Sequence, residues 1–123
     1  MSKYSIAIVD DETEILNVLS RFLVRNANFS VNTYSNPLTA LGSIEGKKYD
    51  LVLLDIMMPQ MNGLEVLEKI KAKDKEQKVI MMTAYSTLDK VLKSHKEGAT
   101  NYVMKPFDSL QNLEKKILEV LES

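Results

Sequence analysis

The chain has 123 residues, enough for about one domain with a single core, and its 45% hydrophobic and 27% charged content is typical of soluble globular proteins. The formal net charge of -1 argues against the positive field of a nucleic-acid binder, and the absence of cysteine excludes disulfides, a thiolate nucleophile and cysteine-ligated zinc. No apolar stretch approaches the roughly 18 residues that span a bilayer, and the first strand begins too early to leave room for a signal peptide, so we expect a cytoplasmic protein.

Five strand-like runs are separated by intervals that each leave room for one helix and two short loops. The runs begin near residues 5, 29, 51, 79 and 101. Between them, apolar residues recur at helical spacing: Ile15, Val18, Leu19 and Phe22; Leu64, Leu67 and Ile70; Leu88, Val91 and Leu92; and Leu113, Ile117 and Leu121. A shorter helix over 37–44 is expected to begin with Asn36 as its cap and Pro37 at its first position. Gly98 is placed to end the helix that contains Leu88.

The strand over 29–34 alternates apolar with polar residues, whereas the runs before Asp10, Asp55 and Thr83 are continuously apolar. An alternating strand has a wetter face or an edge position, so we place it at the rim of the sheet and the others centrally. Right-handed crossovers and a central first strand favour the strand order 2-1-3-4-5. The sequence therefore predicts one α/β domain over residues 1–123, a doubly wound five-stranded parallel sheet with helices on both faces.

Polar side chains stand directly after the apolar runs, at the carboxyl ends of the predicted strands. They are Asp10, Asp11, Asp55, Thr83 and Lys105. Because open α/β sheets hold their sites at this edge, we expect three carboxylates, a hydroxyl and an ammonium to converge there. Neighbouring carboxylates repel one another and need a cation, and all-oxygen ligation suits Mg²⁺ better than zinc or copper. This pattern is typical of a metal-assisted phosphoryl site.

Three of these residues have structural alternatives. Asp11 to Glu14 has the pattern of a capping box at a helix start. Thr83 is an ordinary β-branched strand residue, and Lys105 can be a surface lysine before a turn. Asp55 has no comparable alternative, because a carboxylate at the end of a buried strand costs several kcal/mol if it is left unpaired.

Four motifs, in order and together extending over the whole chain, resemble the receiver domains of two-component response regulators. They are Val9-Asp10-Asp11-Glu12; Leu53-Leu54-Asp55-Ile56-Met57-Met58-Pro59 with Asn62-Gly63; Met82-Thr83-Ala84; and Lys105-Pro106-Phe107. The resemblance implies the CheY-like, flavodoxin-like form of the doubly wound fold and a single-domain receiver. It also implies that Asp55, already ionised, accepts a phosphoryl group from a phosphohistidine on a sensor histidine kinase or histidine phosphotransfer protein. Such a chain is a signalling domain rather than an enzyme and catalyses only its own phosphorylation and dephosphorylation.

The resemblance also assigns the metal ligands and the phosphoryl contacts. Asp11, Asp55 and the backbone carbonyl of Met57 would hold Mg²⁺ directly, and Asp10 would act mostly through a bound water. Thr83 and Lys105 would contact the phosphoryl oxygens.

Further residues are expected to govern the switch and the lifetime of the phosphorylated state. Thr83 and the aromatic Tyr102 would couple phosphorylation to the output surface, and the Lys105-Pro106 bond would be cis. Met57 and Tyr85 lie two positions after Asp55 and Thr83, so their bulk is expected to shield the acyl phosphate from water.

The predicted output surface combines the fourth helix, the fifth strand and the fifth helix. Its lysines favour an acidic downstream protein; they are Lys90, Lys93, Lys96, Lys115 and Lys116. We expect a monomer, with phosphorylation-dependent dimerisation as the alternative, and neither direct contact with nucleic acid nor membrane insertion.

Two rival functions fit the residues less well. A phosphatase of the haloacid dehalogenase type needs a second aspartate two positions after the first, where this chain has Met57. A flavin carrier needs a phosphate-cradling loop after the first strand, where Asp10, Asp11 and Glu12 would repel the phosphate. His95, the single histidine, is interpreted as a solvated surface residue.

Within the receiver family, three roles stay open at this point. The chain can be a signal carrier that docks on a target, a phosphorelay intermediate that passes phosphate to a second histidine, or the receiver fragment of a longer transcriptional regulator. Residues 83–89 are similar to those of sporulation-type relay intermediates, which favours relay.

Overall fold

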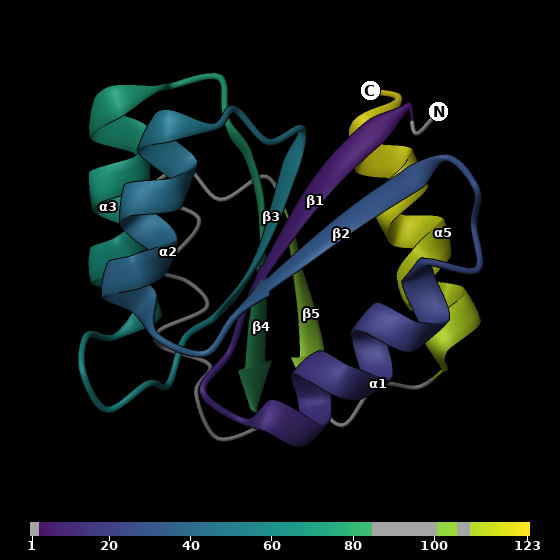
Figure 1. Ribbon diagram of the computed structural model, residues 1–123, viewed down its shortest axis with the longest axis horizontal. Helices are drawn as coiled ribbons and strands as arrows, with labels where there is room; N and C mark the ends of the chain where they lie inside the picture. The colour runs from purple at the N-terminus through teal and green to yellow at the C-terminus, as the bar shows by residue number, and fades with distance from the viewer. Residues whose placement is uncertain (1–2, 85–100, 106–108) are drawn as a thin grey trace.

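A computed structural model describes residues 3–84, 101–105 and 109–123 (Figure 1). Five parallel strands pair in the order β2-β1-β3-β4-β5, which confirms the predicted sheet. The strands are β1 (Tyr4–Val9), β2 (Phe29–Tyr34), β3 (Leu51–Asp55), β4 (Lys78–Ala84) and β5 (Asn101–Lys105). The described helices are α1 (Thr13–Leu23), α2 (Pro37–Gly46), α3 (Gly63–Lys73) and α5 (Leu110–Leu121).

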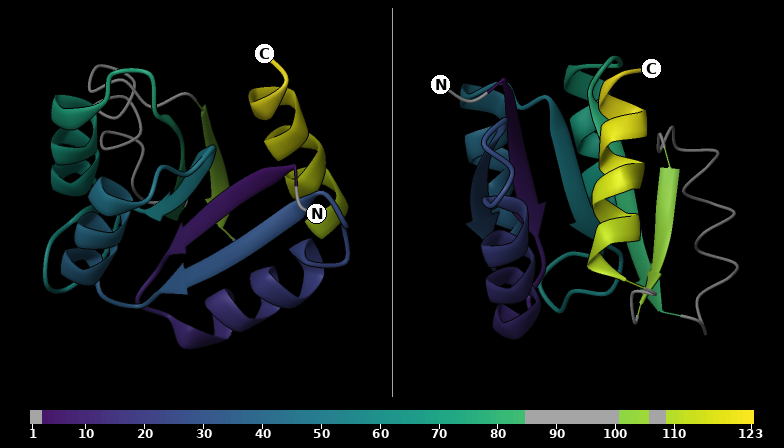
Figure 2. Two further views of the ribbon diagram at one scale, coloured as in Figure 1. Left: turned by 45° about the horizontal axis from the view of Figure 1, so that its top comes forward. Right: turned by 90° about the vertical axis from the view of Figure 1, so that its right-hand side faces the viewer.

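The helices form layers on both faces of the sheet, with α1 and α5 on one face and α2 and α3 on the other (Figures 1 and 2). Alternating residues of β3 supply both layers of the core. Val52 and Leu54 belong to the cluster that includes α2 and α3 residues, while Leu51 and Leu53 belong to the cluster that includes α1 and α5 residues. Because all five residues of β3 are buried, this strand has a fixed central position and carries Asp55 to the sheet edge.

The edge strand and the helix starts follow largely from local sequence. β2 is one of the two edge strands, the other being β5, and it is mostly half-buried, as its alternating pattern predicts. The Asn36 side chain accepts a hydrogen bond from the Leu38 N–H, and Pro37 is the first residue of α2, which confirms the predicted cap. The capping box, which was the structural alternative for the start of α1, does not form: Glu12 is the N-cap residue and makes no side-chain capping hydrogen bond.

The inward face of α1 also differs from the apolar spacing. Its buried residues are Leu16, Leu19 and Leu23, whereas Val18 is 50% exposed. Ile15 and Phe22 are partly buried at the margin of the core. The helix is therefore rotated relative to the face expected from the sequence, because the sheet and α5 determine which apolar ridge is covered.

Several sequence predictions fall outside the described residues. These are the helix containing Leu88, Val91 and Leu92 with its end at Gly98, together with Tyr85, His95 and Pro106. No helix within the described ranges combines the length and apolar content needed to cross a membrane.

Candidate functional site

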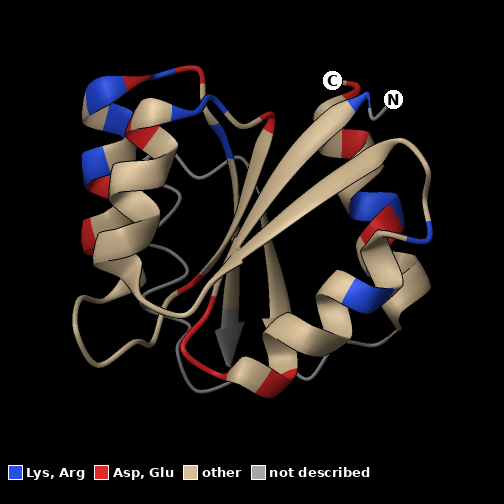
Figure 3. Ribbon diagram, in the orientation of Figure 1, with Lys and Arg blue, Asp and Glu red and all other residues tan. Residues whose placement is uncertain are grey.

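Three aspartates lie together at the carboxyl ends of two adjacent central strands. Asp10 and Asp11 follow β1, and Asp55 is the last residue of its parallel neighbour β3. One carboxylate oxygen from each of the three lies within 4.8 Å of the others. Asp10 is 0% exposed and Asp55 is 4% exposed, while Asp11 is half-buried. Figure 3 shows this acidic region where the ribbons of β1 and β3 end.

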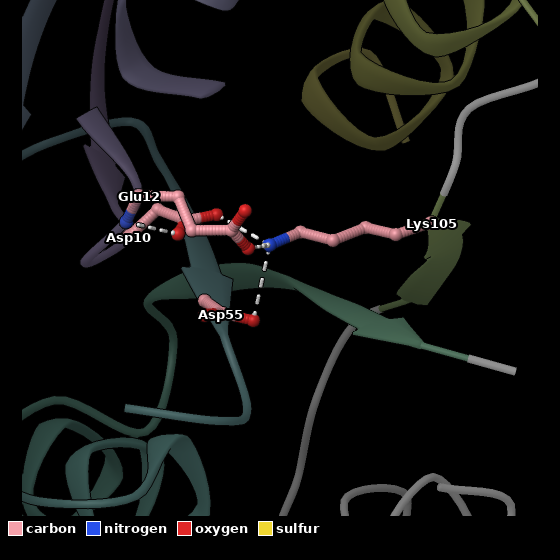
Figure 4. Close-up of polar contacts among 4 residues, drawn as sticks. All are labelled: Asp10, Glu12, Asp55 and Lys105. Carbon is pink, nitrogen blue, oxygen red and sulfur yellow. Dashed lines mark hydrogen bonds and ion pairs between the residues drawn. The ribbon is translucent and has the colours of Figure 1, made fainter. Parts of the chain in front are cut away.

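Lys105 brings a positive charge to the same region from β5, which lies two strands beyond β3 in the sheet order. Its Nζ atom lies 2.6 Å from Asp10 Oδ2 and 3.3 Å from Asp55 Oδ1 (Figure 4). A third carboxylate, Glu12 Oε1, is 3.5 Å from the same Nζ atom. The backbone N–H of Glu12 donates to Asp10 Oδ1 at 2.9 Å. Glu12 was not among the predicted site residues, and the one feature of the sequence that points to it is its position directly after the two aspartates.

Burial and charge both affect the protonation of this site. The pKa of Asp55 is raised to about 7, chiefly by burial and also by the nearby charge of Asp10, although Lys105 and the backbone N–H of Met57 oppose the rise. Burial of Lys105 disfavours its charged form, but the hydrogen bond to Asp10 and the charges of Asp55 and Asp10 outweigh it, so the pKa of Lys105 is raised. The expectation that Asp55 is ionised without assistance therefore needs correction: near pH 7, the carboxyl in the metal-free chain is only partly ionised.

The donor set fits a small hard divalent cation. Three carboxylates and one ammonium leave an excess of two negative charges once all four groups are ionised. The cluster offers oxygen donors alone, which is the ligation that Mg²⁺ prefers. Asp11 and Asp55 would supply carboxylate ligands directly, and Asp10 would act mostly through a bound water. Met57 follows Asp55 by two positions and is 50% exposed; the role of its carbonyl stays a prediction.

Gly63 determines how closely α3 approaches the site. A Cβ atom at this position would lie 2.1 Å from the Asp55 carbonyl oxygen and 2.7 Å from Ile56 Cα, which are both backbone atoms. The Gly63 N–H donates to the Ile56 carbonyl at 2.7 Å, and the Asn62 side chain caps α3 through the Glu65 N–H. Only glycine leaves room for this contact, which explains the Asn62-Gly63 pair in physical terms.

Two other predicted site residues, Thr83 and Tyr102, lie on the neighbouring strands β4 and β5. Thr83 lies on β4 opposite Met104 of β5, and its side chain is outside the described part of the chain. Tyr102 lies on β5 opposite Met81 and packs against the core cluster on the side of α2 and α3. Its backbone carbonyl accepts a hydrogen bond from Lys116 Nζ at 3.4 Å.

Residues 6–118 match the family model described as the response regulator receiver domain. The chain belongs to this family. Receiver domains are signalling domains rather than classical enzymes, and the acidic cluster lies at the sheet edge where the order of the apolar runs predicted it.

Two similar proteins support the family assignment. Sporulation initiation phosphotransferase F from Bacillus subtilis (strain 168) is 37% identical over 108 residues, which are 88% of this chain and 86% of that protein. The transcriptional regulatory protein ZraR from Klebsiella oxytoca is 40% identical over 108 residues, which are 86% of this chain and 24% of that protein. The chain thus spans about a quarter of the length of this second relative.

A solved structure shows the same fold. The CheY-like response regulator receiver domain protein from Methanospirillum hungatei JF-1 superposes with a TM-score of 0.91 at 36% sequence identity, covering 98% of this chain and 95% of that one. The doubly wound fold predicted from the sequence is thereby confirmed.

Proposed function

We propose that Asp55 accepts a phosphoryl group from a phosphohistidine on a sensor histidine kinase or histidine phosphotransfer protein. The observation that carries this proposal is the convergence of Asp10, Asp11 and Lys105 on the Asp55 carboxylate at the end of a fully buried strand. A buried carboxylate beside two more acids destabilises the fold, and the single Lys105 charge does not balance all three, so Asp55 needs a chemical role rather than a structural one. Acceptance of a phosphoryl group supplies one.

The chemistry follows from the positions of the side chains. A carboxylate oxygen of Asp55 attacks the phosphorus in line, the phosphorus–nitrogen bond of the donor breaks, and the imidazole leaves with the electron pair and takes up a proton. The Lys105 ammonium, 3.3 Å from Asp55 Oδ1, is within reach of an equatorial phosphoryl oxygen. Thr83, at the end of β4, would donate a hydrogen bond to another.

Mg²⁺ would be held by Asp11, Asp55 and the Met57 carbonyl, with Asp10 acting mostly through a water. When bound, it would favour the ionised form of Asp55 and balance the charge on the phosphoryl oxygens. The chain's own contribution is to hold these oxygen donors within 4.8 Å of one another and to keep two of the three aspartates almost fully buried.

The effect of phosphorylation would be transmitted to a partner protein through β5 and α5. Tyr102 contacts the core on one side, and its carbonyl is bonded to Lys116 of α5, so a change at β5 can reach the exposed surface of this helix. Lys115 and Lys116 favour an acidic partner. The monomeric state with dimerisation on phosphorylation, the lack of direct nucleic-acid contact and cytoplasmic residence stay predictions.

Phosphorelay is the second candidate role within the family. The match to sporulation initiation phosphotransferase F covers most of that protein, whereas the match to the ZraR regulator covers a quarter of it. A relay intermediate returns its phosphoryl group to a histidine on a second protein, and a carrier or regulator does not. Incubating the phosphorylated chain with candidate histidine phosphotransfer proteins separates the two roles.

Small phosphodonors test the central proposal without a cognate kinase. Acetyl phosphate or phosphoramidate with Mg²⁺ is expected to add one phosphoryl group to the wild-type chain and none to Asp55→Asn, because the amide cannot form the acyl phosphate. Intact-mass spectrometry measures the adduct, and omission of Mg²⁺ is the control. Equal phosphorylation of Asp55→Asn would show that the acceptor is another residue.

A further inference from the structure

The Lys105 ammonium contacts one carboxylate that is not part of the aspartate cluster. Among the described residues it lies 2.6 Å from Asp10, 3.3 Å from Asp55 and 3.5 Å from Glu12 (Figure 4). The side chains of Asp10 and Asp55 are almost completely buried, but that of Glu12 is 61% exposed. The lysine therefore bridges the interior of the site and its outer rim.

The inner two contacts set Lys105 in competition with a divalent cation. The carboxylates of Asp10 and Asp55 are members of the cluster that offers oxygen ligands, and the same two carboxylates hold the ammonium. Two positive groups that share buried carboxylates repel each other strongly, because little water screens them. Lys105 must therefore loosen at least one inner contact before the aspartates can ligate a cation well.

Glu12 is placed to receive the displaced ammonium. It occupies the N-cap position of α1, yet its side chain makes no capping hydrogen bond and is directed to Lys105 instead. Its backbone N–H is bonded to Asp10 Oδ1, which keeps its Cα beside the cluster. Its exposed carboxylate can follow the lysine outward at little cost in desolvation.

We propose that Glu12 is a positioning residue: it holds the Lys105 ammonium away from the three aspartates when they bind a divalent cation, and so strengthens cation binding. This inference rests on the proposed cation site. It predicts that Glu12→Gln weakens Mg²⁺ binding about threefold, the size of effect that an exposed ion pair supports. Lys105→Met should strengthen Mg²⁺ binding, because it removes the competing charge.

A double-mutant cycle separates action through Lys105 from direct attraction between Glu12 and the cation. Calorimetric Mg²⁺ titrations compare the 123-residue wild type, Glu12→Gln, Lys105→Met and the double variant. We expect Glu12→Gln to weaken binding in the wild-type background and to change it little in the Lys105→Met background. Glu14→Gln is the matched control. It removes a charge of the same sign from the second residue of α1 and should bind Mg²⁺ like wild type.

The outcomes distinguish this inference from the proposed function. An equal loss in both backgrounds would show that Glu12 acts directly on the cation, and no loss in either would show that it does not act; each overturns the inference and leaves the cation site intact. A wild-type chain that binds no Mg²⁺ would overturn both. NMR of the Lys105 side chain gives a second readout: Mg²⁺ should move its ε-methylene resonances in wild type and in Glu12→Asp, and Glu12→Gln should alter the shifted position.

Discussion

The raised pKa of Asp55 predicts that the metal-free protein loses stability as the pH rises. In the folded chain, burial and the charge of Asp10 raise the pKa from 3.8 to about 7. Between pH 3.8 and about pH 7, Asp55 is more often protonated in the folded state than in the unfolded state. The free energy of unfolding therefore falls with increasing pH. The contribution of Asp55 is fully present below the unfolded pKa and is lost as the pH passes the folded pKa. From pH 5 to pH 8 this loss amounts to roughly 2–3 kcal/mol.

Urea unfolding in chelator at pH 5, 6, 7 and 8 measures this loss. Other carboxylates also titrate in the range, so the relevant quantity is the difference in free energy of unfolding between wild type and Asp55→Asn. We expect Asp55→Asn to gain roughly 2–3 kcal/mol in free energy of unfolding relative to wild type between pH 5 and pH 8, because the amide does not ionise. Glu68→Gln, an exposed change on α3, should show no such pH dependence. A constant difference between wild type and Asp55→Asn would refute the assigned burial and repulsion at this site.

Three further predictions concern the acidic cluster, the lifetime of the phosphorylated state and the packing of α5. Asp11→Asn should raise the melting temperature in chelator by about 4 °C, because it removes one repelling charge, and should reduce the stabilisation by Mg²⁺; a lower melting temperature would contradict this. Met57→Asn and Tyr85→Ala should shorten the phosphoryl lifetime several-fold in a mass-spectrometric decay assay, since the sequence predicts that bulk at these two positions shields the acyl phosphate; an unchanged decay rate would contradict this prediction. Lys78→Met should lower the free energy of unfolding by about 1 kcal/mol, because Lys78 Nζ donates to carbonyls in the last turn of α5, whereas the exposed Lys69→Met should have little effect.

The sheet was predictable because its strands are set by local apolar runs. Continuous runs before Asp10, Asp55 and Thr83 indicate central strands, and the alternating run over 29–34 indicates an edge, which together lead to the observed strand order. The placement of three acids at one rim follows from that order, because the carboxyl ends of parallel strands share an edge.

Other features depend on contacts between distant elements. The helical spacing of apolar residues predicted Val18 on the inner face of α1. Packing of the helix against the sheet and α5 leaves Val18 exposed instead. The ion pair of Glu12 joins residues that are 93 positions apart. Likewise, the clash that excludes a side chain at Gly63 involves backbone atoms of β3 and its following loop, which no local pattern contains.

The most direct test of the account is the identity of the residue that carries the phosphoryl group. Borohydride reduces an aspartyl phosphate to homoserine, so treating the phosphorylated wild-type chain and sequencing its peptides by mass spectrometry locates the acceptor. The account predicts homoserine in place of Asp55, with Asp10 and Asp11 unchanged and no conversion when Mg²⁺ or the phosphodonor is omitted. Homoserine at another aspartate, or efficient phosphorylation with no conversion at Asp55, would contradict it.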